Sequence, residues 1–201
     1  LFFTVTLAVL AGDLALKYWA FENVVGVPVR VQKTADGPTI QVDQPGIGWV
    51  TMQPKFVDEP ASAVPDHPPI RVLPGILSLR LTINTGAVFG LGKGAQWLFA
   101  TISVGALFVV AFLFIRSPAW VPVWHTALAL VTAGAIGNLY DRVLYKAVRD
   151  MLHLFPETGL WPWIFNLADV ALMVGVGMIV LLSFYRDWQQ QRRQKQQAAD
   201  T

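Results

Sequence analysis

Long apolar segments separated by polar sequence are the main feature of the hydropathy pattern. Four of them, at about residues 1–21, 95–115, 121–140 and 163–185, contain few or no charged side chains. Each has roughly the 20 residues that a helix needs to cross the hydrocarbon of a bilayer. The first lacks the short apolar core and cleavage site of a secretory signal peptide, so we interpret it as a retained helix. The pattern predicts a single all-α polytopic membrane domain over residues 1–201, with four transmembrane helices.

The longest connection, residues 23–93, contains short stretches in which apolar and polar residues alternate. Alternation at residues 24–31 and 71–83 is typical of strands, so we expect a small extracytoplasmic β element there. Between the two stretches lies a Pro-rich insert, about residues 32–70. Clustered Pro and Gly predict turns and loops, and we expect little regular structure between residues 36 and 69.

The distribution of basic residues predicts the orientation in the membrane. Basic side chains gather in the tail, residues 186–201, and Arg116 begins a tight turn at residues 116–119 on the same side. Cytoplasmic segments carry an excess of Lys and Arg, so we expect both termini to be cytoplasmic. The connection at residues 23–93 and the loop at residues 141–162 then lie outside.

Composition agrees with a membrane protein. Hydrophobic residues make up 54% of the chain and charged residues 14%, and the mean hydropathy is +0.49. A soluble domain carries about 25% charged residues, and a disordered chain is more charged still. The absence of Cys excludes a thiol nucleophile, a cysteine zinc site and an iron–sulfur cluster. Three scattered His predict no metal site, and a net charge of only +2 predicts no nucleic acid partner. We expect no other cofactor.

Ionisable residues within a membrane span cost about 2.5–3.5 kcal/mol each, so those present need a reason. Asp13 and Lys17 are four residues apart, on one helix face, where they can pair. The pair is either a structural ion pair or a support for a polar site.

Polar residues also gather where the third span ends and the fourth begins. Asn138, Asp141 and Arg142 follow Gly134 and Gly137, whose small size favours close helix packing. The fourth span opens with Asn166 and Asp169 on one predicted face, and the preceding loop contributes Asp150.

Two carboxylates that converge on a water-accessible site can share one proton. The ionised member can then take a proton from water while the protonated member polarises a carbonyl. Asp150 and Asp169 are candidates for such a peptide-hydrolysing pair. From spacing alone, a proton relay or a structural role stays open.

Together these residues form five motifs that resemble those of lipoprotein signal peptidase, also called signal peptidase II. In chain order the motifs are Asp13-x-x-x-Lys17, Asn84-Thr-Gly-Ala-Val-Phe-Gly90, Gly134-x-x-Gly-Asn-x-x-Asp-Arg142, Val148-Arg-Asp-Met151 and Phe165-Asn-x-Ala-Asp169. The resemblance implies an aspartic endopeptidase of the bacterial cytoplasmic (inner) membrane, with its active site near the outer face. Its partners would be membrane lipid and a diacylglyceryl-modified prolipoprotein, which is cut just before the lipidated Cys.

The resemblance also implies roles for individual residues. Asp150 and Asp169 would be the catalytic pair. Substrate binding and support would come from a larger set: Asp13, Lys17, Asn84, Gly86, Asn138, Asp141, Arg142 and Asn166.

Three features depart from the family pattern: the long insert, Val88 in place of a more usual Ala, and Arg149 in a position that is usually apolar. Arg149 could lower the pKa of Asp150 or point to water. Alternatives from other classes are a proton- or ion-coupled carrier and a non-catalytic scaffold. A serine–lysine peptidase using Ser78 and Lys93 is a weaker alternative.

Overall fold

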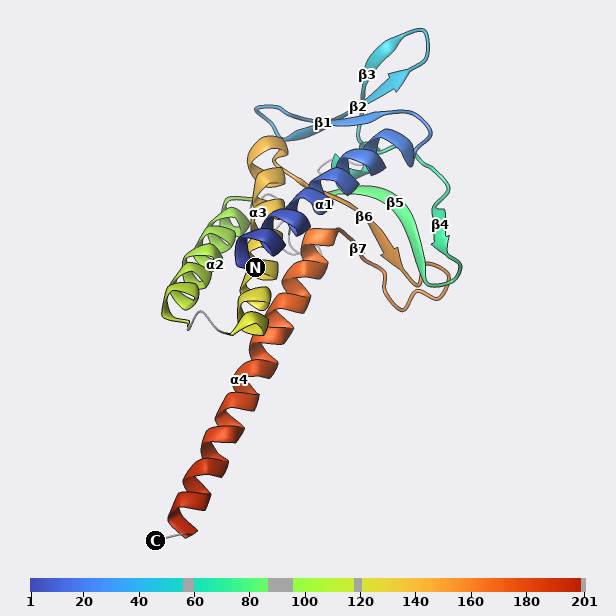
Figure 1. Ribbon diagram of the computed structural model, residues 1–201. Coiled ribbons are helices and arrows are strands. Elements are labelled where there is room, and N and C mark those ends of the chain that lie inside the picture. The colour runs from blue at the N-terminus through green and yellow to red at the C-terminus, as the bar shows by residue number, and fades with distance from the viewer. Residues whose placement is uncertain (56–59, 87–95, 118–120, 200–201) are drawn as a thin grey trace.

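The computed structural model describes residues 1–55, 60–86, 96–117 and 121–199. Within these residues the chain forms four α-helices: α1 (Phe2–Asn23), α2 (Gln96–Arg116), α3 (Pro122–Tyr145) and α4 (Leu167–Ala199). Figure 1 shows α3 between α2 and the start of α4, with α1 crossing over it. Three of these helices, α1, α2 and α4, are long and apolar enough to cross a membrane.

The prediction of an all-α protein with four transmembrane helices is wrong. Among the described residues, α3 falls below the hydropathy that marks the other three helices as candidate spans. The reason is its central position, because α3 packs against α1, α2 and α4. Gly134 is so close to α4 that an added Cβ would lie 2.3 Å from the Ala168 carbonyl oxygen. Small residues serve helix contact there and lower the hydropathy.

Two antiparallel sheets also contradict the all-α prediction. In the described part of the chain, the first sheet has the order β1 (Val29–Lys33), β2 (Pro38–Gln44) and β3 (Gly48–Met52). The second has the order β4 (Ile70–Leu73), β5 (Leu77–Asn84), β6 (Val148–Leu154) and β7 (Ile164–Phe165). The loop at residues 141–162 therefore supplies a strand that pairs with β5.

The insert is more ordered than the sequence predicts. It contains β2, β3 and a 3₁₀ helix, η1 (Pro60–Ala63). Apolar and polar residues alternate at residues 39–42 of β2. Ile40 and Val42 lie in the core, while Thr39 and Gln41 face outward. Period-two burial of this kind stabilises a strand on an apolar surface, even in a Pro-rich context.

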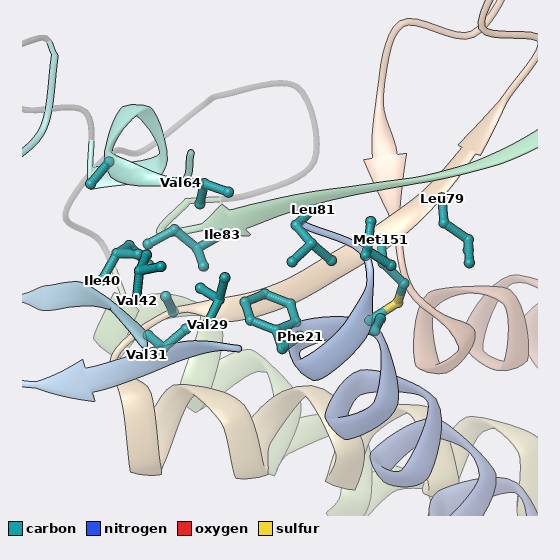
Figure 2. Close-up of a cluster of buried hydrophobic side chains, with 14 residues drawn as sticks. Phe21, Val29, Val31, Ile40, Val42, Val64, Leu79, Leu81, Ile83 and Met151 are labelled. Carbon is teal, nitrogen blue, oxygen red and sulfur yellow. The ribbon is translucent and has the colours of Figure 1, made fainter. Parts of the chain in front are cut away.

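One apolar cluster joins the end of α1 to both sheets, as Figure 2 shows. Phe21 lies at its centre, between Val29 and Val31 of the first sheet and Leu81 and Met151 of the second. Burying a large apolar side chain contributes about 1.5–3 kcal/mol. The cluster therefore holds the two sheets on the helices and fixes where β6 runs.

Two lysines fasten the first sheet to the end of α3. Lys33 Nζ donates to the Val143 carbonyl at 3.1 Å, and Lys146 Nζ donates to the carbonyls of Thr34 and Ala35, each at 2.9 Å. Lys146 ends α3 in the left-handed conformation, with φ of 55°. This conformation turns the chain from the helix into β6.

Helix α4 is the longest element and projects beyond the rest of the molecule in Figure 1. Its first turns pack against α3 and α1, whereas its second half is mostly exposed and ends in the basic tail. The predicted turn at residues 116–119 lies partly outside the described residues, which omit 118–120.

Candidate active site

Helix α4 begins with a reciprocal cap that places a carboxylate at its amino end. The Asn166 side-chain oxygen accepts a hydrogen bond from the Asp169 backbone N–H at 2.9 Å, and Asp169 Oδ2 accepts one from the Asn166 backbone N–H at 3.2 Å. This arrangement satisfies N–H groups that the first turn of a helix leaves without partners. The predicted proximity of Asn166 and Asp169 is therefore present, in the form of a cap.

Asp150 approaches the same point from β6. It pairs with Thr82 of β5, its side chain is buried, and its Oδ1 accepts a hydrogen bond from Asn166 Nδ2 at 2.6 Å. Burial raises the pKa of Asp150 well above its ordinary value, and the charge of Asp169 raises it further. Hydrogen bonds from Asn166 and Asn84 act in the opposite direction.

Two side-chain amides link the carboxylates. Asn138 of α3 donates from Nδ2 to Asp169 Oδ1 at 2.7 Å, and its Oδ1 accepts from Asn166 Nδ2 at 3.1 Å. Asn166 Nδ2 also donates to Asp150. One asparagine amide therefore orients each carboxylate, and the two amides contact each other. Asp150 and Asp169 are thus brought together from β6 and α4.

Behind this pair lies the predicted ion pair of α1. Asp13 Oδ2 is 2.8 Å from Lys17 Nζ, and both side chains are buried. Lys17 Nζ also lies 3.3 Å from Asp141 Oδ2, and Asp13 Oδ1 accepts the backbone N–H of Ala168 at 2.9 Å. The ion pair therefore connects α1 to α3 and to the start of α4.

Arg149 neither points to water nor contacts its neighbour Asp150 through a hydrogen bond that the structure records. Its guanidinium donates to Asp141 Oδ1 from Nη2 at 2.8 Å and from Nε at 3.2 Å. The sequence alone does not place Arg149 in the site, because its pairing with Asp141 joins β6 to α3 across a turn. The available signal was the short separation of the opposite charges Asp141 and Arg149, which are eight residues apart in the chain.

The remaining predicted residues lie around the pair or outside the described residues. Arg142 donates to the Asn138 carbonyl at 3.3 Å, and Asn84 Oδ1 accepts the backbone N–H of Gly86 at 3.0 Å. Val88 and Lys93 are outside the described residues. The serine–lysine alternative therefore has only Ser78 in the structure, buried in β5.

Comparison with known proteins decides the family. A family model described as signal peptidase (SPase) II matches residues 5–185. The chain belongs to the signal peptidase II family. Together with three apolar helices of membrane-spanning length, this membership makes it a membrane protein and does not favour the carrier alternative.

Relatives from this family are similar to more than half of the chain. A lipoprotein signal peptidase of Desulfitobacterium hafniense (strain DSM 10664 / DCB-2) is 38% identical over 120 residues, which are 59% of this chain and 76% of the relative. One from Nitratidesulfovibrio vulgaris (strain DP4) is 33% identical over 141 residues, 67% of this chain and 83% of the relative.

A solved structure shares the fold of the signal peptidase II chain. It is a bacterial membrane enzyme determined by the in meso method at 2.3 Å resolution. It superposes with a TM-score of 0.65 at 22% identity, covering 92% of this chain and 87% of its own.

Proposed function

We propose that this chain is an aspartic endopeptidase that removes the signal peptide from diacylglyceryl-modified prolipoproteins, cutting just before the lipidated Cys. The observation that carries the proposal is the meeting of Asp150 and Asp169 through the amides of Asn138 and Asn166. Family membership supplies the class of reaction. Carboxylates held in this way can activate water without a side-chain nucleophile.

Asp150 holds the proton that the pair shares, because burial and the charge of Asp169 raise its pKa. Asp169 is then the charged member, and it takes a proton from water as the water oxygen adds to the peptide carbonyl carbon. Asp150 donates its proton to the carbonyl oxygen. In the second step Asp169 gives its proton to the leaving nitrogen, the C–N bond breaks, and a hydroxyl of the intermediate returns a proton to Asp150.

The surrounding residues place the substrate. Asn84 ends β5 and Gly86 follows it, near Asp150 of the paired strand, and both are suited to hold the extended peptide around the scissile bond. Arg142 supports Asn138 by donating to its carbonyl. Asp13, linked through Lys17 to Asp141, supports the backbone next to Asp169.

Lipid is the second partner that we propose. Large apolar side chains lie exposed on the apolar helices, with Phe108 71%, Leu181 70% and Phe184 70% exposed. Such exposure is costly in water and favourable in hydrocarbon, so these side chains contact lipid tails. The diacylglyceryl group of the substrate can stay in the same hydrocarbon while its peptide reaches the site.

Cleavage of a synthetic diacylglyceryl prolipopeptide by the purified enzyme tests this function. Asp150→Asn and Asp169→Asn should each lower the rate at least about 1,000-fold, because each removes a proton-transfer group. Asp187→Asn is a matched control on the exposed part of α4 and should cleave at the wild-type rate. Both variants should melt cooperatively, which shows that they are folded. Full cleavage by either variant would contradict the assignment of Asp150 and Asp169 as the catalytic pair.

The orientation is also a proposal: a bacterial cytoplasmic membrane, the C-terminal tail in the cytoplasm, and the site near the outer face. Because the chain has no Cys, single cysteines can report it. Ile47→Cys, at a position 74% exposed in the β2–β3 turn, should react with an impermeant maleimide in intact cells. Gln194→Cys in the tail should react only after permeabilisation. The reverse pattern would contradict the orientation.

A further inference from the structure

Arg149 and Asp150 are neighbours in β6, but their side chains contact different residues. The Arg149 guanidinium lies 4.6 Å from the Tyr145 ring and 6.0 Å from the Phe21 ring, and the residue is 8% exposed. Its side chain makes two hydrogen bonds to Asp141 Oδ1, and its backbone N–H donates to Asp141 Oδ2 at 3.0 Å. One carboxylate thus fixes both the side chain and the backbone of Arg149.

From Asp141 the contacts continue to the other side of the site. Lys17 lies between Asp141 and Asp13, at 3.3 and 2.8 Å, and Asp13 accepts the backbone N–H of Ala168. The ends of this chain of contacts are the backbone N–H groups of Arg149 and Ala168. These residues directly precede the two aspartates of the candidate active site.

We infer that Arg149 is a positioning residue, which sets the separation of the Asp150 and Asp169 carboxylates through Asp141, Lys17 and Asp13. This inference rests on the proposed function. We call the four side chains Arg149, Asp141, Lys17 and Asp13 the ionic brace. The brace ties the residue before one aspartate to the residue before the other, although they belong to β6 and α4.

Charge balance explains why the arginine is needed. With Arg149 the buried brace contains two cations and two carboxylates. Without it, Asp141 and Asp13 share Lys17 alone, which leaves one buried negative charge without a counter-charge. The backbone hydrogen bond at the β6 end then loses its support. Because a displacement of about 1 Å can slow a positioned reaction by about 100-fold, the effect should appear in turnover.

Steady-state cleavage of the diacylglyceryl prolipopeptide by Arg149→Met and Arg149→Lys tests the inference. Arg149→Met should lower kcat by about 10- to 100-fold and leave KM within about twofold, because the four side chains of the brace are buried and act on the carboxylates. Arg149→Lys should recover part of the loss, because it keeps the charge but not the planar fork. Wild-type kcat in Arg149→Met would overturn the inference. So would a lower melting temperature with unchanged kcat of the folded enzyme.

Arg30→Met is the matched control. Arg30 lines the same cavity of about 230 Å³ as Arg149, but its guanidinium stacks 3.8 Å from the Trp49 ring on the first sheet. This variant should keep the wild-type kcat. If Arg149→Met does not fold, Arg149→Lys tests the inference alone. We then expect its kcat to be several-fold below that of the wild type. A kcat equal to that of the wild type would contradict the inference.

A double-mutant cycle identifies the route of the effect. Because Arg149 acts through Asp141, adding Arg149→Met to Asp141→Asn should change kcat less than about twofold further. Independent, multiplying effects would overturn the inference. The proposed function is tested separately, by cleavage in the wild type and its loss in Asp150→Asn and Asp169→Asn. Those results stand whatever Arg149 does.

Discussion

The two surroundings of β6 differ in what they contribute. Asp150 lies among amides and carboxylates between β6, α3 and α4, whereas Met151, the next residue, lies in the apolar cluster with Phe21 and Leu81. A typical hydrogen bond contributes about 0.5–1.5 kcal/mol net, less than a buried apolar side chain. The polar side therefore specifies geometry and the apolar side supplies stability, so substitutions should separate activity from folding.

The largest effect on activity outside the carboxylates should come from Asn166. Asn166→Ala removes the amide that contacts Asp150 and Asn138, as well as the cap of α4, and should lower kcat about 100-fold. Asn166→Ser restores a good helix cap without the amide. We expect it to recover melting temperature but not kcat. Recovery of both would show that the cap alone matters.

On the apolar side, Ile40→Ala should cost about 2–5 kcal/mol of unfolding free energy, because Ile40 is fully buried in the cluster. The kcat of the folded fraction should stay near wild type. Chemical denaturation in detergent and active-fraction kinetics measure the two quantities. Thr39→Ala, on the other face of β2, is the control and should change stability by less than about 1 kcal/mol. A large loss of kcat in folded Ile40→Ala would break the comparison.

Gly134 packs against the start of α4, and its substitution should affect both stability and activity. In Gly134→Ala the new Cβ would lie 2.3 Å from the Ala168 carbonyl oxygen, so α3 and α4 must separate. We expect a loss of about 1–3 kcal/mol and a lower kcat, since the start of α4 carries Asp169. Gly105→Ala in α2 meets no atom within 4 Å and should be neutral or stabilising. Thermal melts of both variants compare them, and equal behaviour would contradict close packing at Gly134.

The smallest expected effect is on stability, and it comes from the buried carboxyl of Asp150. The pKa of Asp150 is raised in the folded chain above its ordinary value of 3.8, so folding favours its protonated form. Its contribution to stability is present below pH 3.8 and is lost as the pH rises through the higher pKa. Asp150→Asn should therefore raise the melting temperature by a few degrees at neutral pH, and the gain should shrink at acid pH. An Asp150→Asn variant that melts below the wild type at neutral pH would contradict the prediction that burial of Asp150 lowers stability.

Sequence patterns predict contacts between residues that are close in the chain. Asp13 and Lys17 pair because four residues make one helical turn, and Asn166 and Asp169 meet for a similar reason. The alternation in β1 and β5 likewise predicts strands. These features need no knowledge of the fold.

Contacts between distant segments could not be predicted in this way. The pairing of Lys17 with Asp141, and of Asp141 with Arg149, depends on where α1, α3 and β6 meet. The prediction of α3 as a fourth transmembrane helix failed because length and absence of charge do not ensure high hydropathy, which the small and polar residues of α3 lower. The order of the insert was missed because its prolines and glycines obscured the alternation around Ile40.

The β2–β3 turn has a practical consequence. Gly46 and Gly48 have φ angles of 80° and 89°, Ile47 is exposed, and the hairpin points away from the helices in Figure 1. At its base, Lys33 and Lys146 hold the first sheet against α3. A small rigid protein fused at this turn would give a 22.2 kDa membrane enzyme the added mass and asymmetric outline that single-particle imaging requires.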